Sequence, residues 1–292
     1  MRIGYLILNY KDAERSLAAG LAAAAMDCVQ EVLIVDNCSP DDSWERLQTA
    51  AGGKLSVLRS KKNGGYSYGN NLGVRCLAEK GCDVIAIANP DVSVSGEDLL
   101  LLAEALADPA YAVVSGMEYD KNAHPTRPIL WSLKTYRDDI RSCFPLISRL
   151  LTSRGKEEAL PAPSLKPQPA EILRGSFLVC RTADFLNAGG FDEKVFLYCE
   201  ERILAKRIEQ TGKRLGFVSA ASYIHDHASS MEREYCSAAD RMKLLHRSVL
   251  YYQDVYCHIG RIRHFLLLLC MKWAVFEFGV RDRIRKQRRE RK

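Results

Sequence analysis

The first 116 residues alternate short apolar runs rich in β-formers with segments whose composition favours helix. Strands that alternate with helices predict a mainly parallel sheet with helices on both faces. The predicted fold class is therefore α/β, and ligands of such a sheet bind at the carboxyl ends of its strands. The expected strands are residues 2–10, 31–37, 55–60, 83–89 and 110–116, and the expected helices are residues 14–26, 42–50, 66–80 and 96–107.

The alternation stops after the fifth strand. Residues 119–170 include four prolines close together near their end, which predicts an irregular inserted loop. Beyond the loop, regular structure is expected at residues 172–180 and in a helix over residues 202–211. The chain is expected to be helical from residue 231 onward, so two domains are predicted, over residues 1–230 and 231–292.

The composition is ordinary for a soluble globular protein, with 47% hydrophobic and 27% charged residues among 292. The ten cysteines form no C-x-x-C pair, and no secretory signal is recognised at the N-terminus. A disulfide framework and a structural zinc site therefore have no support. A reducing cytoplasm is the expected location.

The positive charge is concentrated at the C-terminus. Residues 281–292 hold eight Lys or Arg against two acidic residues, whereas the rest of the chain is balanced. The preceding residues 265–280 are mostly apolar but are shorter than the roughly 20 residues of a spanning helix. Together they predict a helix lying on an anionic membrane. The alternatives are a helix packed on the domain or on a second copy in a homodimer, and nucleic acid is disfavoured because interleaved aromatic residues are missing.

Two groups of acidic residues suggest chemistry. Asp91 follows a predicted buried strand, where a hard oxygen ligand can hold a divalent cation beside a phosphate. Glu200 and Glu201 are adjacent carboxylates, and either can act as a base. Two acidic residues at an exposed helix start, and an Asn-Pro-Asp turn, are the structural alternatives.

Six motifs occur in the order and spacing seen in inverting family 2 glycosyltransferases of the GT-A fold. The chain resembles this family over about residues 1–230, and most closely its bacterial members of capsular or O-antigen polysaccharide synthesis, including rhamnosyltransferase-like enzymes. The resemblance implies a GT-A catalytic domain that moves a sugar from a UDP- or dTDP-sugar to a saccharide acceptor. The motifs are LILNY, IVDNCSPD, NGGYSYGNNLG, IANPDV, GGFDEKVFLYCEE and IHDHASS.

The resemblance assigns the first three motifs, and Asn89 of the fourth, to the nucleotide. Asp36 matches the family's nucleotide-binding Asp, and the glycines of NGGYSYGNN allow close backbone approach at a helix start. Each of these residues also has a simpler explanation as a turn or capping residue. The predicted nucleotide-binding residues are Leu8, Tyr10, Asp36, Asn37, Asn63, Gly65, Asn70 and Asn89.

The resemblance also implies a metal ion, Mg²⁺ or Mn²⁺. Asn89 and Asp91 stand where the family often has Asp-x-Asp, so Asp91 is the predicted metal ligand. His225 matches the family's metal- or diphosphate-contacting His, and His227 is a second candidate for that role. The presence of one protein carboxylate predicts weak metal binding without nucleotide.

Glu201 takes the position of the family's general base, with Glu200 beside it. A base is required because the acceptor hydroxyl loses its proton as it attacks the anomeric carbon in a single inverting displacement. Gly175 and Asp192 are predicted on the acceptor side, although a glycine turn with a buried Phe is also a good structural corner. Trp131 and Tyr136 are further candidates for stacking on a sugar.

These inferences predict a cytoplasmic enzyme that is peripheral on the inner face of the plasma membrane and acts on a lipid-linked acceptor. One alternative is an enzyme of the same fold that acts on a protein or a small molecule. Another is a nucleotide-sugar-binding scaffold protein that has lost catalysis, which Asn89 and Arg202 suggest because both depart from the family pattern.

Overall fold

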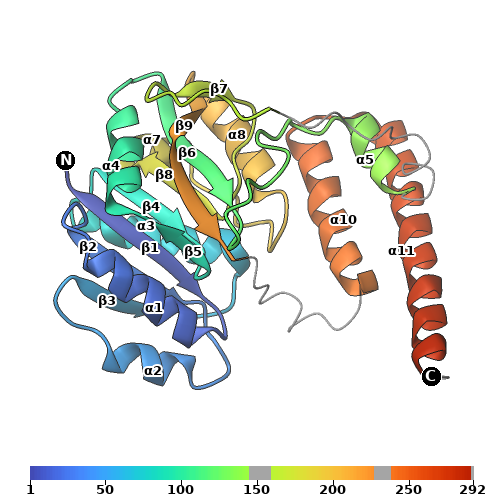
Figure 1. Cartoon of the computed structure of the whole chain (residues 1–292). Coiled ribbons are helices and arrows are strands. Elements are labelled where there is room, and N and C mark those ends of the chain that lie inside the picture. The colour runs from blue at the N-terminus through green and yellow to red at the C-terminus, as the bar shows by residue number, and fades with distance from the viewer. Residues whose placement is uncertain (145–158, 227–237, 291–292) are drawn as a thin grey trace. The chain divides into compact units, whose positions relative to one another are not determined.

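The computed structural model describes residues 1–144, 159–226 and 238–290 (Figure 1). The chain divides into two compact units. The first comprises residues 1–132, 158–196 and 200–228, and the second comprises residues 133–157, 197–199 and 229–292. The predicted domain boundary at residue 230 stays a prediction.

The first unit is built on one sheet of nine strands, in the order β3-β2-β1-β4-β8-β6-β9-β5, with β7 also paired to β9. The first four strands are mutually parallel, with Asn9 opposite Asp36 in the β1–β2 register. Their apolar residues are almost fully buried, as expected for strands covered on both faces. The bounds are β1 Ile3–Asn9, β2 Glu31–Asp36, β3 Leu55–Arg59 and β4 Val84–Ala88.

Beyond β4 the sheet is mixed. Strand β8 is antiparallel to both β4 and β6, while β6 and β9 are parallel. A parallel partner needs a crossover connection, usually through a helix packed on the sheet, whereas β8 returns after the long connection that follows β6. The α/β class is confirmed, and the antiparallel strands follow from that return. The remaining bounds are β5 Val92–Val94, β6 Tyr111–Tyr119, β7 Gln168–Ala170, β8 Phe177–Arg181 and β9 Arg214–His225.

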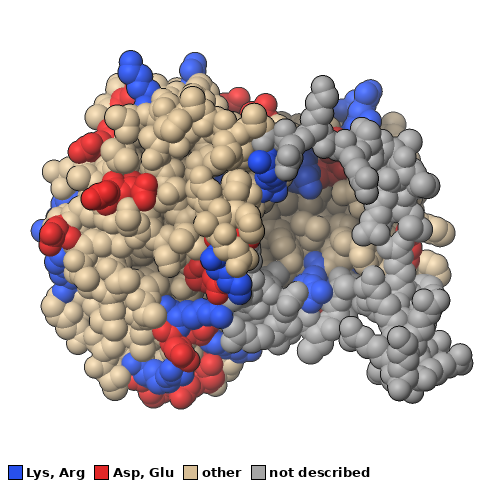
Figure 2. All heavy atoms as spheres, in the orientation of Figure 1, with Lys and Arg blue, Asp and Glu red and all other residues tan. Residues whose placement is uncertain are grey.

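The helices that flank the sheet form where the sequence favours them. Helix α4 starts at the N-cap Ser95, whose hydroxyl accepts a hydrogen bond from the Asp98 amide at 3.0 Å. Helix α3 lies close to β1 because its Gly69 and Gly73 face Leu8 and Leu6. The bounds are α1 Ala13–Ala24, α2 Ser43–Thr49, α3 Gly65–Glu79, α4 Gly96–Ala105, α7 Thr182–Asn187 and α8 Glu200–Gln210. On the face shown in Figure 2, the acidic and basic side chains of this unit are interspersed.

The second unit is helical. Helices α10 (Ala238–Val255) and α11 (Gly260–Glu290) lie side by side as an antiparallel pair (Figure 1). The segment expected to be irregular contains helix α5 (Tyr136–Ser142). This helix begins at a capping box formed by Thr135 and Asp138. Within the residues described, none of the helices combines the length and apolar composition needed to cross a bilayer.

Candidate active site

A carboxylate and an imidazole meet at the end of β4. Asp91 lies in the turn between β4 and β5, directly before β5, and the antiparallel pairing of β5 with β9 places Val92 opposite His225. As a result, the Asp91 Oδ1 atom lies 3.3 Å from the His225 Nε2 atom. The structure therefore brings together two of the predicted metal ligands, and His227 lies outside the described residues.

A second carboxylate, that of Glu118, contacts the other ring nitrogen of His225. The Glu118 Oε2 atom lies 3.4 Å from His225 Nδ1 and accepts hydrogen bonds from Ser176 and Tyr223 at 2.8 and 3.0 Å. Burial raises the pKa of Glu118, but the hydrogen bonds from His225 and Ser176 and the charge of Arg174 bring it down to about 2. Glu118 is therefore a fixed negative charge.

His225 is correspondingly held as a cation. Burial lowers the pKa of His225, but hydrogen bonds to Asp91 and Glu118 outweigh burial and raise it to about 9. The local negative charge that attracts this proton also favours a metal cation in its place.

The donor set fits a borderline divalent cation only in part. Asp91 offers an oxygen and His225 a nitrogen, the pairing that Mn²⁺ accepts. Across the described ranges, no group of three or more His, Cys, Asp or Glu side chains is arranged to hold a metal ion. A metal at this pair would thus need further ligands from the substrate, and weak binding without nucleotide stays a prediction.

Glu201 lies in the first turn of α8, against the backbone of Gly175. A Cβ atom on Gly175 would lie 2.7 Å from the Glu201 Oε1 atom, so the absence of a side chain there makes room for the carboxylate. Burial raises the pKa of Glu201, partly offset by hydrogen bonds from its own and the Gly175 amides and by the charge of Arg202. A carboxylate with a raised pKa takes up a proton more readily.

Two neighbours complete the surroundings of Glu201. Glu200 is buried at the first position of α8. Tyr66 donates a hydrogen bond from its hydroxyl to the Gly175 carbonyl oxygen at 2.6 Å. Burial first, and then the charges of Glu201 and Glu200, raise the pKa of Tyr66, so its hydroxyl stays a neutral donor.

The tripeptide Arg174–Gly175–Ser176 lies between the surroundings of His225 and those of Glu201. Arg174 lies 3.6 Å from Glu118 Oε1, Gly175 contacts Glu201, and the Ser176 carbonyl accepts a hydrogen bond from the Asn89 amide at 2.9 Å. Three consecutive residues therefore contact the predicted base Glu201, the carboxylate Glu118 next to His225, and the backbone of Asn89.

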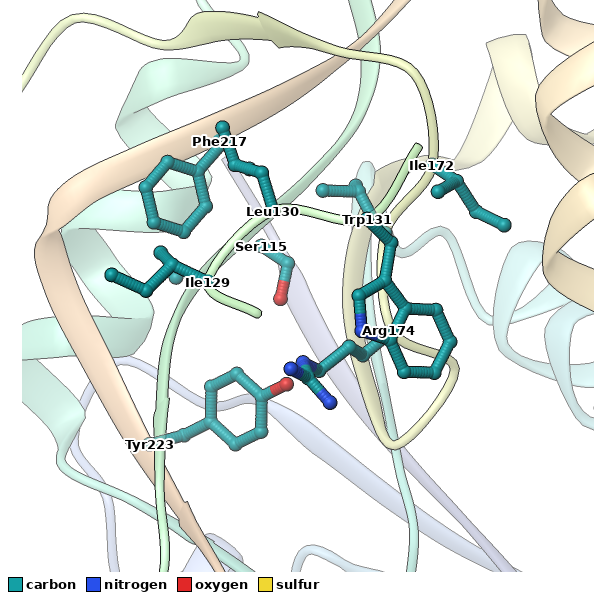
Figure 3. Close-up of a pocket in the computed structure, with 10 residues that line it drawn as sticks. Ser115, Ile129, Leu130, Trp131, Ile172, Arg174, Phe217 and Tyr223 are labelled. Atoms are coloured by element: carbon teal, nitrogen blue, oxygen red, sulfur yellow. The ribbon is translucent and has the colours of Figure 1, made fainter. Parts of the chain in front are cut away.

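Arg174 also lines a small cavity on the sheet. Figure 3 shows its guanidinium between the Tyr223 hydroxyl and the Trp131 indole, and the guanidinium carbon lies 4.6 Å from the indole centroid. This cation–π contact fixes Trp131 beside the site. Tyr136 belongs to the second unit, and its predicted role stays a prediction.

The predicted nucleotide residues Asp36 and Asn37 are built into the fold. Asp36 is fully buried and accepts a hydrogen bond from the Asn9 amide at 2.9 Å. Asn37 donates to the Asn63 side chain and to the Gly65 carbonyl, both at 3.1 Å. They position the loop before α3, and their contact with a nucleotide stays a prediction.

Gly65 has a conformation that a side chain would not tolerate. Its φ is 84°, and a Cβ atom would lie 2.0 Å from the Phe196 carbonyl oxygen. The Tyr66 amide donates to that same oxygen at 3.0 Å. The glycine motif and the GGFDEKVF segment are thus in direct contact.

The other predicted nucleotide residues differ in their exposure. Asn70 is buried and donates to the Tyr66 carbonyl at 3.0 Å, a bond within its own helix. Leu8 packs against Gly69, and both Leu8 and Tyr10 are half-buried. Asn89 is also half-buried, next to Asp91 in the same turn.

The acceptor-side turn is held by its own fold contacts. Asp192 is buried, lies 3.2 Å from Arg207 of α8, and accepts a hydrogen bond from the Lys194 amide at 3.0 Å. These contacts account for Asp192 as a structural residue. Its acceptor role, like that of Gly175, stays a prediction.

The sequence did not predict a role for Glu118, Tyr223 or Asn71. Glu118 lies between the strand predicted over residues 110–116 and the loop predicted over residues 119–170, and Tyr223 directly precedes the IHDHASS motif. Asn71 follows Asn70 in the glycine motif, and its side chain makes two bonds to the Phe191 backbone at 2.9 and 3.0 Å. The only available signal was the pair of adjacent Asn residues in a helix, where Asn is unfavourable.

Residues 9–152 match the family model described as Glycosyl transferase family 2. The chain is 28% identical over 195 residues to rhamnosyltransferase WbbL of Escherichia coli (strain K12), covering 62% of this chain and 67% of that protein. It is 27% identical over 237 residues to the N-acetylglucosaminyl-diphospho-decaprenol L-rhamnosyltransferase of Mycobacterium tuberculosis, covering 77% of this chain and 75% of that protein.

Solved structures resemble the fold. The mannosyltransferase PcManGT from Pyrobaculum calidifontis, in complex with GDP-Man and Mn²⁺, superposes with a TM-score of 0.57 at 15% identity and covers 96% of this chain and 73% of its own. GalNAc-T7 with UDP, GalNAc and Mn²⁺ gives a TM-score of 0.56 at 14% identity over 88% of this chain. The match spans 49% of the GalNAc-T7 chain. At these identities the likeness concerns the fold alone.

Proposed function

The chain is a family 2 glycosyltransferase with a GT-A fold, and on that premise we propose that it transfers one sugar from a UDP- or dTDP-sugar to a lipid-linked saccharide, with inversion. The observation that carries the proposal is the Arg174–Gly175–Ser176 tripeptide. It contacts Glu201, a buried carboxylate with a raised pKa, and it contacts Glu118, which lies 3.4 Å from His225 of the Asp91–His225 pair.

Glu201 is the general base of the proposed reaction. The acceptor hydroxyl oxygen forms a bond to the anomeric carbon while the bond from that carbon to the diphosphate oxygen breaks. The electron pair of the broken bond leaves with the nucleoside diphosphate, and the hydroxyl proton passes to Glu201. Attack from the face opposite the leaving group inverts the anomeric configuration.

Asp91 and His225 would hold the divalent metal, Mg²⁺ or Mn²⁺. When bound, the metal neutralises charge that develops on the departing diphosphate, as a Lewis acid. Support comes from their 3.3 Å separation and from the structural relatives whose complexes contain Mn²⁺. Glu118 keeps the His225 ring in place through its second nitrogen, as an outer carboxylate commonly does for a metal-bound His.

The donor and acceptor classes rest on the relatives. Two relatives carry rhamnosyltransferase in their names, and one names a diphospho-decaprenol acceptor. We therefore favour a deoxyhexose such as rhamnose as the sugar and a polyprenyl-diphosphate-linked saccharide as the acceptor, in surface polysaccharide assembly. A further relative, the low-salt glycan biosynthesis hexosyltransferase Agl10 of Haloferax volcanii, supports the broader class of hexose transfer at 25% identity over 234 residues.

A membrane surface is the proposed place of the reaction, because α11 exposes an apolar stripe. Its six large apolar side chains are between 47% and 79% exposed and fall within an arc of about 100° on an ideal helix. The sequence continues into the basic residues 281–292, which suit an anionic surface. We propose that this stripe contacts the cytoplasmic face of the plasma membrane. The stripe consists of Ile262, Phe265, Leu266, Leu269, Trp273 and Phe276.

Purified protein incubated with dTDP-rhamnose or UDP-sugars, a short-chain polyprenyl-diphosphate saccharide and Mn²⁺ tests the proposal. The expected result is transfer from one donor class, loss of transfer on chelation of the metal, and an inverted anomeric configuration in the NMR spectrum of the product. Asp91→Ala should lose metal-dependent donor binding, whereas Asp27→Ala, an Asp outside the site, should keep it. A product with retained configuration would overturn the single displacement.

A further inference from the structure

The second unit contains a groove between α10 and α11 that the proposed reaction does not use. Four residues of each helix line it at spacings i, i+3, i+4 and i+7, so each helix contributes one continuous face. The cavity volume is about 400 Å³, which is in the range of about 300–1,000 Å³ typical of small-molecule sites. Its lining residues are Lys243, His246, Arg247, Leu250, Leu268, Met271, Lys272 and Val275.

The groove is amphiphilic. Leu250, Leu268, Met271 and Val275 form an apolar floor, while three exposed cations, Lys243, Arg247 and Lys272, are on its edge. No acidic side chain is among the lining residues in the described part of the chain. Lys243 pairs with Asp240 at 2.8 Å, but that pair is exposed and therefore weak.

A buried imidazole also lines the groove. His246 is 8% exposed, and among the described residues its Nδ1 atom has no hydrogen-bond partner. Burial lowers the pKa of His246 to about 4, so the ring is neutral and carries one donor and one acceptor nitrogen. A buried polar atom without a partner is costly, and a polar ligand group would remove that cost.

The groove is next to the apolar stripe of α11. Within residues 265–276 of an ideal helix, Lys272 alone lies between the stripe and the groove residues Leu268 and Val275 on that side. A molecule that leaves a bilayer at the stripe would therefore pass a cation before it reached the apolar floor.

We propose that this groove binds the phosphorylated isoprenoid carrier of the acceptor, with the start of its hydrocarbon chain on the floor and its phosphate at the Lys243, Arg247 and Lys272 edge. The charge of the edge and the apolar floor match the two parts of such a lipid. The identity of the lipid as the acceptor's carrier rests on the proposed function, whereas its binding to the groove does not.

Calorimetric titration of the protein with farnesyl phosphate tests binding to the groove. Farnesol and inorganic phosphate, the two halves of this ligand, are titrated separately for comparison. The full chain should bind farnesyl phosphate at least about tenfold more tightly than either half. Val275→Trp, which fills the floor, should weaken binding by about tenfold or more. Its control Val255→Trp, on the exposed end of α10, should leave binding unchanged.

The edge is tested separately. The double change Lys243→Gln and Arg247→Gln should weaken farnesyl phosphate binding but leave farnesol binding as it was, and Arg261→Gln, an exposed cation outside the groove, is the control. Equal binding by the parent and Val275→Trp would overturn the proposal. An absence of farnesyl phosphate binding by the parent protein would also overturn the proposal. If Val275→Trp also unfolds in that case, the protein itself fills the groove.

Transfer assays separate this proposal from the proposed function. Val275→Trp should raise KM for a polyprenyl-linked acceptor while slow hydrolysis of the donor stays at the parent rate. Unchanged KM with normal transfer would reject the groove and keep the enzyme. Farnesyl phosphate binding without any transfer would keep the groove and reject the proposed acceptor.

Discussion

Glu201 carries the chemistry in this account, and its surroundings give it a raised pKa. Burial raises the pKa of this carboxylate above that of a glutamate in water, and the hydrogen bonds from its own and the Gly175 amides offset burial only in part. The active form of the base is the deprotonated one. Rate is therefore lost as pH falls through the pKa of Glu201.

The acid limb of the pH dependence of kcat is expected above pH 4.5, the ordinary value for a glutamate. The direction follows from burial, which favours the neutral carboxyl. The measurement is kcat at saturating donor and acceptor across pH, with circular dichroism at each pH to confirm that the protein is folded. A limb at or below pH 4.5 would show that Glu201 is not the titrating base.

Gly175→Ala is expected to lower kcat about tenfold to a hundredfold. The new methyl group would lie 2.7 Å from the Glu201 Oε1 atom, and displacement of a catalytic group by about 1 Å costs up to about a hundredfold in rate. Kinetic assay beside Gly279→Ala, where an added methyl meets nothing within 4 Å, isolates the effect. Equal rates in the two variants would mean that the carboxylate position does not depend on Gly175.

Whether a site residue could be predicted from the sequence depends on how far away in the sequence its contacts lie. Asp91, His225, Glu200 and Glu201 were identified because each lies in a motif at a strand end or a helix start. The role of Glu118 depends on Ser176 and Tyr223, which are 58 and 105 residues away. No local pattern reports such a contact.

Among the elements, α11 has the clearest division of faces. Leu267, Met271 and Ala274 are buried, whereas Leu269, Trp273 and Phe276 on its other side are about half exposed or more. A soluble helix normally turns polar residues outward, so this face needs a surface to cover it. The sequence predicted a membrane-associated region here but did not separate the two faces.

Trp273→Glu is expected to reduce flotation of the protein with anionic vesicles by about tenfold or more. Burial of a large apolar side chain contributes about 1.5–3 kcal/mol, and every 1.4 kcal/mol is about tenfold. Leu186→Glu places the same charge at an exposed apolar position of α7 and is expected to float like the parent. Parent protein that stays in the soluble fraction would contradict the membrane contact.

The α10–α11 pair is expected to lose stability in mild acid through His246. Its pKa in the folded protein is lowered from 6.5 to about 4, so only the unfolded chain gains a proton between these values. Stability is complete above pH 6.5 and falls as pH drops towards 4, by about 1–3 kcal/mol. The nearby charges that line the same groove, Lys243, Arg247 and Lys272, are all positive and act in the same direction.

Urea unfolding of the parent and His246→Phe at pH 7 and pH 5 checks this expectation. The free energy of unfolding should fall more between the two pH values in the parent than in the variant. His264→Phe is the control, since His264 lies 2.8 Å from Asp254 and is not buried. An equal fall in the parent and His246→Phe would place the acid sensitivity elsewhere.

For the whole molecule, the sequence predicted the order of elements better than their pairing. The first four strands and their helices can be predicted from alternation alone. Each strand is a short apolar run, and a helix joins each strand to the next, as a parallel sheet requires. The antiparallel pairing of β8 with β4 and β6 depends on where a long connection returns. Periodicity carries no information about that return.

The site follows from the pairing as much as from the motifs. The β5–β9 register places His225 beside Asp91, and the end of β6 supplies Glu118. A strained backbone in the second unit is a further feature that no motif predicts. Tyr198 and Cys199 have φ values of 70° and 66°, a left-handed conformation that is costly for such side chains.

Turnover of Glu201→Gln at equal donor occupancy tests the assignment of Glu201 as the general base. We expect kcat for transfer to fall by about a hundredfold to ten-thousandfold, while the Kd of the donor with Mn²⁺ stays within about twofold of the parent value. Glu209→Gln, on the exposed side of the same helix, should match the parent in both. Transfer by Glu201→Gln at the parent rate would contradict the assignment of Glu201 as the base.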